Sequence, residues 1–232
     1  MRLFSSIIND IKIQFRSGFY YAYLFVCAIY VTAVFQLPDS FRSYGVFYVI
    51  FTDPTVLGFY FIGGLILLER RQKTVTSLFV TPLRLNEYLA SKVVSLGLLG
   101  LISSLLIAII LLGGNFNIPV FSLTVILASA IFTLTGVTLG VQAQNINSYL
   151  FISPLYLLPI VLPVLGFLGI VSKNLFFFIP THSILNLLNY SILDIKRSSL
   201  WIDFSLLIVW TGIAFCWAKS WFTKFIINQT GE

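Results

Sequence analysis

Hydrophobic and charged positions are segregated along this chain into long blocks. Six blocks carry almost no charge and are long enough to cross a bilayer, which takes about 20 residues of α-helix at roughly 1.5 Å per residue. They cover approximately residues 18–37, 44–68, 93–112, 120–141, 149–171 and 200–218. The pattern predicts an all-α membrane protein with six transmembrane helices.

The segment before the first block, residues 1–17, carries an apolar stripe at helical spacing. The stripe consists of Phe4, Ile7, Ile8, Ile11 and Phe15. Asp10, Lys12 and Arg16 lie off the stripe. This arrangement predicts an amphipathic helix lying in the membrane interface. The alternative is that these residues are the charged start of the first spanning helix.

Two of the spans contain helix-breaking residues that are candidate functional positions. Asp53-Pro54 interrupts the second span, where a carboxylate within the membrane is costly and suggests function. Alternatively, the second span begins after Pro54 and Asp53 lies near the outer interface. The fifth span contains Pro154, Pro159 and Pro163, each lacking a backbone donor, so we expect a break or hinge there.

Residues 172–199, between the fifth and sixth spans, are apolar in part but too interrupted to cross a bilayer. Phe177 and Phe178 precede Pro180, which with Thr181 and His182 looks like a helix start. The segment predicts a short outer re-entrant or interfacial helical hairpin, and the alternative is a mobile outer loop. His182 is expected at a helix interface rather than as a ligand.

Composition confirms the membrane class and narrows the chemistry. The chain has 232 residues, of which 58% are hydrophobic and 9% charged, and its mean hydropathy is +0.97. This favours one membrane domain over residues 1–232. There is one histidine, there are two cysteines, and there is no phosphate-binding loop of the G-x-x-x-x-G-K-[ST] type. We therefore expect no enzyme activity, no metal and no cofactor in this chain.

Lysine and arginine residues set the predicted orientation. With the N-terminus inside, inner segments carry Arg2, Lys12, Arg16, Arg70, Arg71, Lys73, Arg84, Lys92, Lys219 and Lys224. Outer loops carry only Arg42, Lys173, Lys196 and Arg197. The imbalance predicts that both termini are cytoplasmic in the cell (plasma or inner) membrane. It also accounts for the net charge of +6, so nucleic acid is not an expected partner.

The cytoplasmic loop 69–92 holds seven of the 22 charged residues. Within it Val75, Leu78 and Phe79 form an apolar face at helical spacing, Pro82 ends that helix, and Asn86 is a candidate cap for the next one. A topogenic loop requires only positive charge. A short amphipathic helix is more than topology requires, and it suits docking into a groove on a soluble partner.

The sequence "ERRQKTVTSLFVTP", residues 69–82, resembles the loop of type-2 ABC exporter permeases. The matching positions are Glu69, Arg70, Thr74, Leu78, Val80, Thr81 and Pro82. Lys73 and Thr76 depart from the pattern, since the family often has a glycine and an acid there. The resemblance extends to the six-helix layout, the N-terminal interfacial helix and the outer hairpin.

The resemblance implies a permease subunit that dimerises, as a homo- or heterodimer, and pairs with separate ATP-binding subunits that carry ATP and Mg. Residues 69–82 would be the coupling helix, with Glu69, Arg70, Thr74, Val75, Leu78, Phe79, Thr81, Pro82 and Arg84 as coupling residues. The region around 176–193 would be the outer gate.

The short chain is similar to compact drug-export permeases, including the fluoroquinolone-export type, which implies a hydrophobic or amphipathic substrate. The haem-exporter B subunit of cytochrome c maturation is a near relative of the same size. Two other classes stay open: an ATP-independent channel or secondary transporter using Asp53, and a membrane scaffold that transports nothing.

Overall fold

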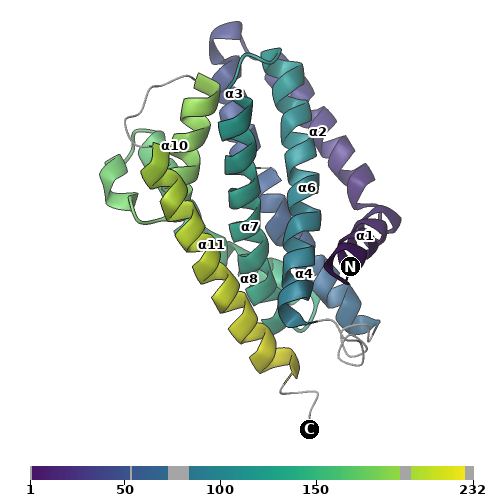
Figure 1. Cartoon of the computed structure of the whole chain (residues 1–232). Coiled ribbons are helices and arrows are strands. Elements are labelled where there is room, and N and C mark those ends of the chain that lie inside the picture. Colours follow the sequence, from purple (N-terminus) through teal and green to yellow (C-terminus); the bar gives the residue numbers. More distant parts are fainter. Residues whose placement is uncertain (1, 53, 73–83, 194–199, 228–232) are drawn as a thin grey trace.

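The computed structural model describes residues 2–52, 54–72, 84–193 and 200–227, and the elements in these ranges are helices packed as a bundle (Figure 1). In chain order they are α1 (Arg2–Arg16), α2 (Phe19–Phe35), α3 (Asp39–Thr52), α4 (Pro54–Arg71), α6 (Leu85–Leu112), α7 (Ile118–Gln142), α8 (Ile146–Val161), α9 (Pro163–Phe167), the 3-10 turn η1 (Lys173–Phe176), α10 (Pro180–Leu193), α11 (Leu200–Phe222) and the π-helical turn η2 (Thr223–Ile227).

Helix α7 is the centre of the bundle, between α6 and α11 in Figure 1. Every side chain from Ala128 to Val141 on this helix is buried, because α4, α6, α10 and α11 pack around it. The closest approach is to α4, where Gly136 faces the backbone of Phe59. A Cβ at Gly136 would lie 2.6 Å from the Phe59 carbonyl oxygen, so only glycine allows this helix spacing.

Three described helical segments are long and apolar enough to cross a membrane: Leu85–Leu112, Ile118–Gln142 and Leu200–Phe225. A fourth candidate is the bent pair Arg2–Arg16 and Phe19–Phe35, whose axes differ by 65°. The bend is at Gly18, whose φ of 80° lies in the left-handed region that favours glycine. An all-helical membrane protein is therefore confirmed, while the number of six spans stays a prediction.

The second and fifth predicted spans can be compared with expectation at their prolines. The second is covered by α3, which ends at Thr52, and α4, which begins at Pro54, and residue 53 between them lies outside the described residues. The interruption expected at Asp53-Pro54 falls at this point. The fifth runs without a break through Pro154 and Pro159 and ends at Val161. The expected break at the first two prolines is therefore wrong. The chain does break before the third proline, since α8 ends at Val161 and α9 begins at Pro163.

The interfacial segment is helical and turns its polar face toward the bundle. In α1 the buried side chains are Asp10 and Gln14, whereas Phe4 is 69% exposed and Phe15 is 54% exposed. The apolar stripe thus faces away from the protein, as a helix lying on lipid would require. Helix α1, the C-terminal end of α11 and the facing ends of α4 and α6 lie at one end of the bundle (Figure 1).

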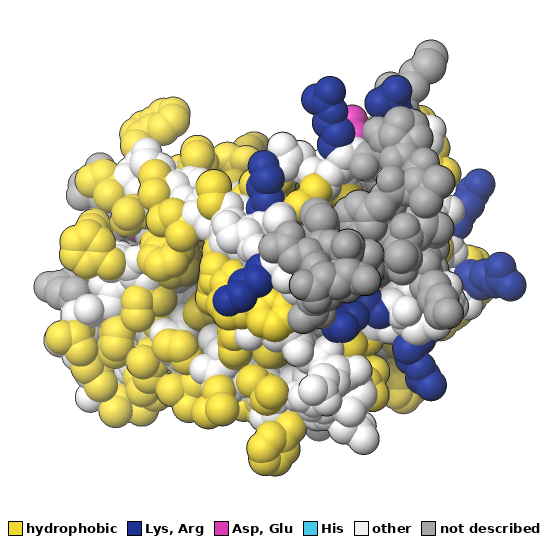
Figure 2. Space-filling model, turned by 90° about the horizontal axis from the view of Figure 1, so that it is seen from below, with side chains coloured by type: hydrophobic (Ala, Val, Ile, Leu, Met, Phe, Trp, Pro, Cys, Tyr) yellow, Lys and Arg dark blue, Asp and Glu magenta, His cyan; other side chains and the backbone are white. Residues whose placement is uncertain are grey.

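That end of the bundle is basic. Figure 2 shows Lys and Arg side chains spread over it. The exposed ones in the described ranges include Lys12, Arg16, Arg71, Arg84, Lys219 and Lys224. All six belong to segments predicted to be cytoplasmic from the charge bias.

Candidate functional site

A buried ionic cluster joins three helices at the basic end of the bundle. The Lys92 ammonium of α6 donates to Asp10 Oδ1 of α1 at 2.6 Å and to the Glu69 carboxylate of α4. Lys92 is 1% exposed and both carboxylates are 5% exposed. We call Lys92, Asp10, Glu69, Tyr88 and Ser91 the Lys92 cluster.

Hydroxyl groups donate hydrogen bonds to the carboxylate oxygens that do not contact Lys92. The Tyr88 hydroxyl donates to Glu69 Oε2 at 2.6 Å, and the Ser91 hydroxyl donates to Asp10 Oδ2 at 2.7 Å. A buried charge is tolerated only where partners and hydrogen bonds replace water, and each carboxylate here has both. The cluster therefore fixes α1 and α4 against the first turns of α6.

A second row of polar contacts continues along the same two helices. The Gln14 amide donates to Ser95 Oγ at 2.9 Å, and the Ser6 hydroxyl donates to Ser91 Oγ at 3.0 Å. Because Ser6 and Gln14 lie one helical turn on either side of Asp10, α1 is bonded to α6 at three successive turns.

Two expected coupling residues differ in their surroundings: Arg70 is bonded to the end of α7, and Arg84 is exposed. Arg70 donates through one guanidinium nitrogen to the carbonyls of Val141 and Ala143, at 3.2 and 3.0 Å, where α7 ends. A cation at a helix C-terminus binds carbonyls that have no partner within the helix. Arg84 is exposed and directly precedes α6.

The start of α6 differs from the expected cap. The Arg84 backbone N–H donates to the Glu87 carboxylate at 2.9 Å, and the helix begins at Leu85. The interpretation of Asn86 as the cap is wrong, because Glu87 at the third helical position already satisfies the free donor.

The other expected coupling residues, Thr74, Val75, Leu78, Phe79, Thr81 and Pro82, lie outside the described residues, as does Asp53. Arg70 and Arg84 are the nearest described coupling residues on either side of that gap. The docking helix and the intramembrane carboxylate remain predictions.

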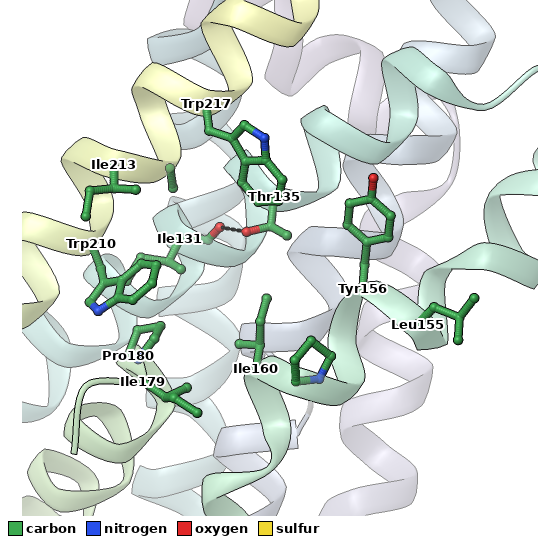
Figure 3. A pocket seen from close by; sticks show the side chains of 12 residues that line it. Ile131, Thr135, Leu155, Tyr156, Ile160, Ile179, Pro180, Trp210, Ile213 and Trp217 are labelled. Atoms are coloured by element: carbon green, nitrogen blue, oxygen red, sulfur yellow. Dashed lines mark hydrogen bonds between the residues drawn. The ribbon is translucent and has the colours of Figure 1, made fainter. Parts of the chain in front are cut away.

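An apolar pocket of about 470 Å³ lies among α7, α8, α10 and α11 (Figure 3). We call it the aromatic pocket, and its walls are formed by Ile131, Thr135, Leu155, Tyr156, Pro159, Ile160, Ile179, Pro180, Trp210, Ile213, Ala214 and Trp217. No charged side chain is among them. The volume is within the range of sites that hold drug-sized molecules.

Polar atoms of the aromatic pocket are bonded within the protein. The Thr135 hydroxyl donates to the Ile131 carbonyl at 2.8 Å, and the Trp210 indole N–H donates to the Phe178 carbonyl at 2.7 Å. The Tyr156 hydroxyl exchanges hydrogen bonds with the Gln142 side chain. A ligand therefore meets mainly hydrocarbon and ring faces.

A larger hollow, of about 860 Å³, lies at the basic end. It is bordered by α2, α4 and the start of α8, and Arg70 and Arg71 are among its lining residues. This hollow combines charged and apolar walls, in contrast to the aromatic pocket.

The expected gate residues gather around the start of α10. Pro180 begins α10 and lines the aromatic pocket together with Pro159 of α8. His182 is 4% exposed; its Nδ1 lies 3.2 Å from the Asn186 side-chain nitrogen, and its ring is 6.0 Å from the rings of Phe167 and Phe177. Phe178 is 76% exposed. Pro154 lies within α8 and does not line the aromatic pocket.

Sequence reasoning missed the Lys92 cluster and the aromatic pocket as units. From sequence, Lys92 carries only the signal of a topogenic charge, although it directly precedes an apolar block, and Asp10 is only a polar position beside the stripe. A uniformly apolar sequence does not show which side of its helix packs against a neighbouring helix. Nothing in the sequence therefore marks Tyr156 and Trp217 as residues that line the same pocket. Among the described residues, no group of three His, Cys, Asp or Glu residues could hold a metal ion.

The bundle defines an integral membrane protein built from apolar helices. Its sequence then places it within a transport family, since the profile of the fluoroquinolones export permease protein family matches residues 1–230. The chain belongs to that family.

Two curated relatives are similar over nearly the whole chain. They are fluoroquinolones export permease proteins of Mycobacterium tuberculosis, from strains CDC 1551 / Oshkosh and ATCC 25618 / H37Rv. Each is 24% identical over 235 residues, covering 99% of this chain and 98% of the relative.

Proposed function

We propose that this chain is the transmembrane subunit of an ATP-binding-cassette exporter of the ABC-2 type. Two copies, identical or homologous, line the pathway in the cell membrane, with both termini cytoplasmic. Separate subunits bind ATP and Mg and drive export of a hydrophobic or amphipathic compound such as a drug. The observation that carries the proposal is the match to export permeases along the whole chain.

The position of the Lys92 cluster supports the coupling part of the proposal. Segment 73–83 connects α4 to α6, and Glu69 and Lys92 join these two helices and α1 close to its ends. A force applied to the segment by a soluble partner reaches all three helices, because a buried ion pair resists separation. The exposed basic side chains at the same end suit an acidic rim on that partner.

The family match favours drug export over haem export. It also gives no support to the alternative of an ATP-independent channel or secondary transporter, whose central residue, Asp53, lies outside the described ranges. A gene for an ATPase with a phosphate-binding loop beside the gene for this chain would separate these classes at once.

The coupling proposal is tested with the permease assembled with its ATP-binding subunit in lipid. Changing Leu78→Asp and Phe79→Asp together should leave assembly intact and abolish substrate-stimulated ATP hydrolysis, since charge cannot enter an apolar groove. The matched control, Leu78→Met with Phe79→Leu, should retain stimulation. Unaltered stimulation in the assembled Asp variant would refute the proposal.

The dimer is tested separately by mass measurement of the complex in native membranes. Two permease copies per complex are expected, and one copy would refute the shared pathway.

A further inference from the structure

The hollow of about 860 Å³ at the basic end is lined by two cations and, among the described residues, by no acid. We call it the basic hollow. Its cations, Arg70 and Arg71, are the last two residues of α4. The carboxylate nearest to them in sequence, Glu69, is bonded to Lys92 in the Lys92 cluster. The charge of the hollow therefore favours an anionic ligand.

Arg70 is held in place with donors to spare. Its Nη1 donates to the carbonyls of Val141 and Ala143, which fixes the guanidinium at the end of α7. These two bonds do not use the donors of Nε and Nη2. Arg71, the next residue, is exposed. A fixed guanidinium beside a second arginine suits a phosphate group, which accepts several hydrogen bonds at once.

The start of α8 adds neutral donors to the same hollow. Gln144 and Asn145 line it, and α8 begins at Ile146. The Asn145 side-chain oxygen accepts from the Ser148 backbone N–H at 2.8 Å, so its amide nitrogen is left as a donor. The first N–H groups of this 16-residue helix lie at the positive end of its dipole and add to the effect of the arginines.

The other walls of the basic hollow are hydrocarbon. Leu67, in its floor, is 6% exposed, and Ile146, at its rim, is 54% exposed. Phe19 and Leu68 also line it. An inorganic anion would contact the polar side alone, whereas a phosphate that carries acyl chains contacts both sides.

The hollow lies at the depth where lipid head groups are expected. Ser17 and Phe19, which line it, flank Gly18, where α1 and α2 meet at 65°. Helix α1 exposes its apolar stripe, as a helix in the interface does, and α2 continues into the apolar layer. Basic pockets between spanning helices at this depth bind anionic head groups.

We infer that the basic hollow binds one anionic phospholipid from the leaflet at the basic end. Arg70 and Arg71 bind the phosphodiester, the Gln144 and Asn145 amides donate to the head group, and Leu67 and Phe19 contact the upper part of the acyl chains. The inference goes beyond the proposed function, since this lipid is a bound component of the permease and its binding requires no ATP-binding subunit.

Binding is tested by native mass spectrometry of the full-length permease in an uncharged detergent. The probe is palmitoyl-oleoyl-phosphatidylglycerol, and one tightly bound molecule per chain is expected, with at least about tenfold higher affinity than phosphatidylcholine with the same chains. Equal binding of the two lipids would mean unspecific lipid contact and would overturn the inference.

Two partial ligands distinguish a lipid from other sources of the same chemistry. Dioleoylglycerol has chains without phosphate, and glycerol 3-phosphate has phosphate without chains. Neither should displace phosphatidylglycerol at equal concentration, because each contacts only one kind of wall. Displacement by glycerol 3-phosphate would assign the hollow to a soluble phosphate compound and overturn the lipid.

Matched variants locate the site. Arg71→Gln should weaken phosphatidylglycerol binding about fivefold, as expected for one interfacial arginine. Lys219→Gln, at an exposed position of the same end that does not line the hollow, should leave binding unchanged. Equal losses in these two variants would indicate diffuse surface charge and contradict the site.

A second pair tests the apolar side of the hollow. Gly64 lines the hollow, and an added Cβ there meets nothing within 4 Å, so Gly64→Leu fills the space without disturbing helix packing. Binding should fall about tenfold while thermal stability in detergent is kept. Gly212→Leu on α11, where a Cβ also meets nothing within 4 Å, is the control and should bind normally. Unchanged binding in both Arg71→Gln and Gly64→Leu would refute the assignment, whatever the outcome for ATP-driven export.

Discussion

The Lys92 cluster and the aromatic pocket lie in different parts of one bundle. The cluster joins α1, α4 and α6, its charges are paired and buried, and water is excluded. The pocket lies among α7, α8, α10 and α11, has no charge, and is left open on one side. The ion pairs and hydrogen bonds of the Lys92 cluster hold three helices together, whereas the pocket leaves apolar surface available to a ligand.

The difference shows how a small membrane protein separates rigidity from binding. In lipid, apolar side chains gain little by packing against one another, so close backbone contact and polar bonds hold helices together. Polar bonds join α1, α4 and α6, and close backbone contact joins α4 to α7 at Gly136. Where the polar groups are satisfied and no charge is present, as between α8 and α11, an apolar cavity can remain. Helix α7 contacts α4, α6 and α11, and so connects the two regions.

The largest expected effect comes from removing the only cation of the Lys92 cluster. Lys92→Met leaves the carboxylates of Asp10 and Glu69 buried and unpaired, so unfolding free energy should fall by about 3–5 kcal/mol. Reversible denaturation in detergent measures it. Lys219→Met, at an exposed site on the same end, should change stability by less than about 0.5 kcal/mol.

The same cluster allows a rescue experiment. Neutralising all three groups in Lys92→Met, Asp10→Asn and Glu69→Gln should recover most of the lost stability, because no charge then remains without a partner. If the single Lys92→Met variant is as stable as the wild type, the cluster does not stabilise the packing of α1, α4 and α6.

A smaller effect is expected where the two regions meet. Gly136→Val places side-chain atoms against the Phe59 backbone and should force α4 from α7, at a cost of about 1–3 kcal/mol. Gly212→Val on α11, where an added Cβ meets nothing within 4 Å, is the matched control. Equal stability of both variants would show that the close approach is not needed.

Removing one hydroxyl from the cluster should cost less again. Tyr88→Phe deletes the 2.6 Å bond to Glu69 while the ion pair stays, so we expect a loss of about 1.5 kcal/mol in unfolding free energy. Tyr21→Phe, at a 65% exposed position, should be neutral. A loss as large as that of Lys92→Met would mean that the hydroxyl, and not the ammonium, holds the cluster.

The smallest effect is expected inside the pocket. Thr135→Val removes a hydroxyl that donates only to the Ile131 carbonyl of its own helix, so the unfolding free energy should change by less than about 1 kcal/mol in the same denaturation assay. A loss as large as that of Tyr88→Phe would show that the pocket also depends on a polar bond, and would contradict the contrast between the two regions.

Much of the architecture could be predicted from the sequence, but little of the candidate site. The apolar blocks indicated α2, α6, α7 and α11 because hydrophobic length alone marks a spanning helix. The sequence pattern could not predict that α8 continues through Pro154 and Pro159. That outcome depends on which neighbours satisfy the backbone.

The sequence by itself determined the membrane class, the family and the basic end of the bundle, since these follow from composition, local order and charge along the chain. Only the tertiary structure decided that Lys92 meets Asp10, 82 positions away in sequence, and Glu69, 23 positions away. It also decided that Tyr156 and Trp217 share one pocket. The physical reason is that an apolar helix has no strong preference for which face it turns inward. Partner helices, a glycine that lets them approach, and a few buried polar bonds make that choice.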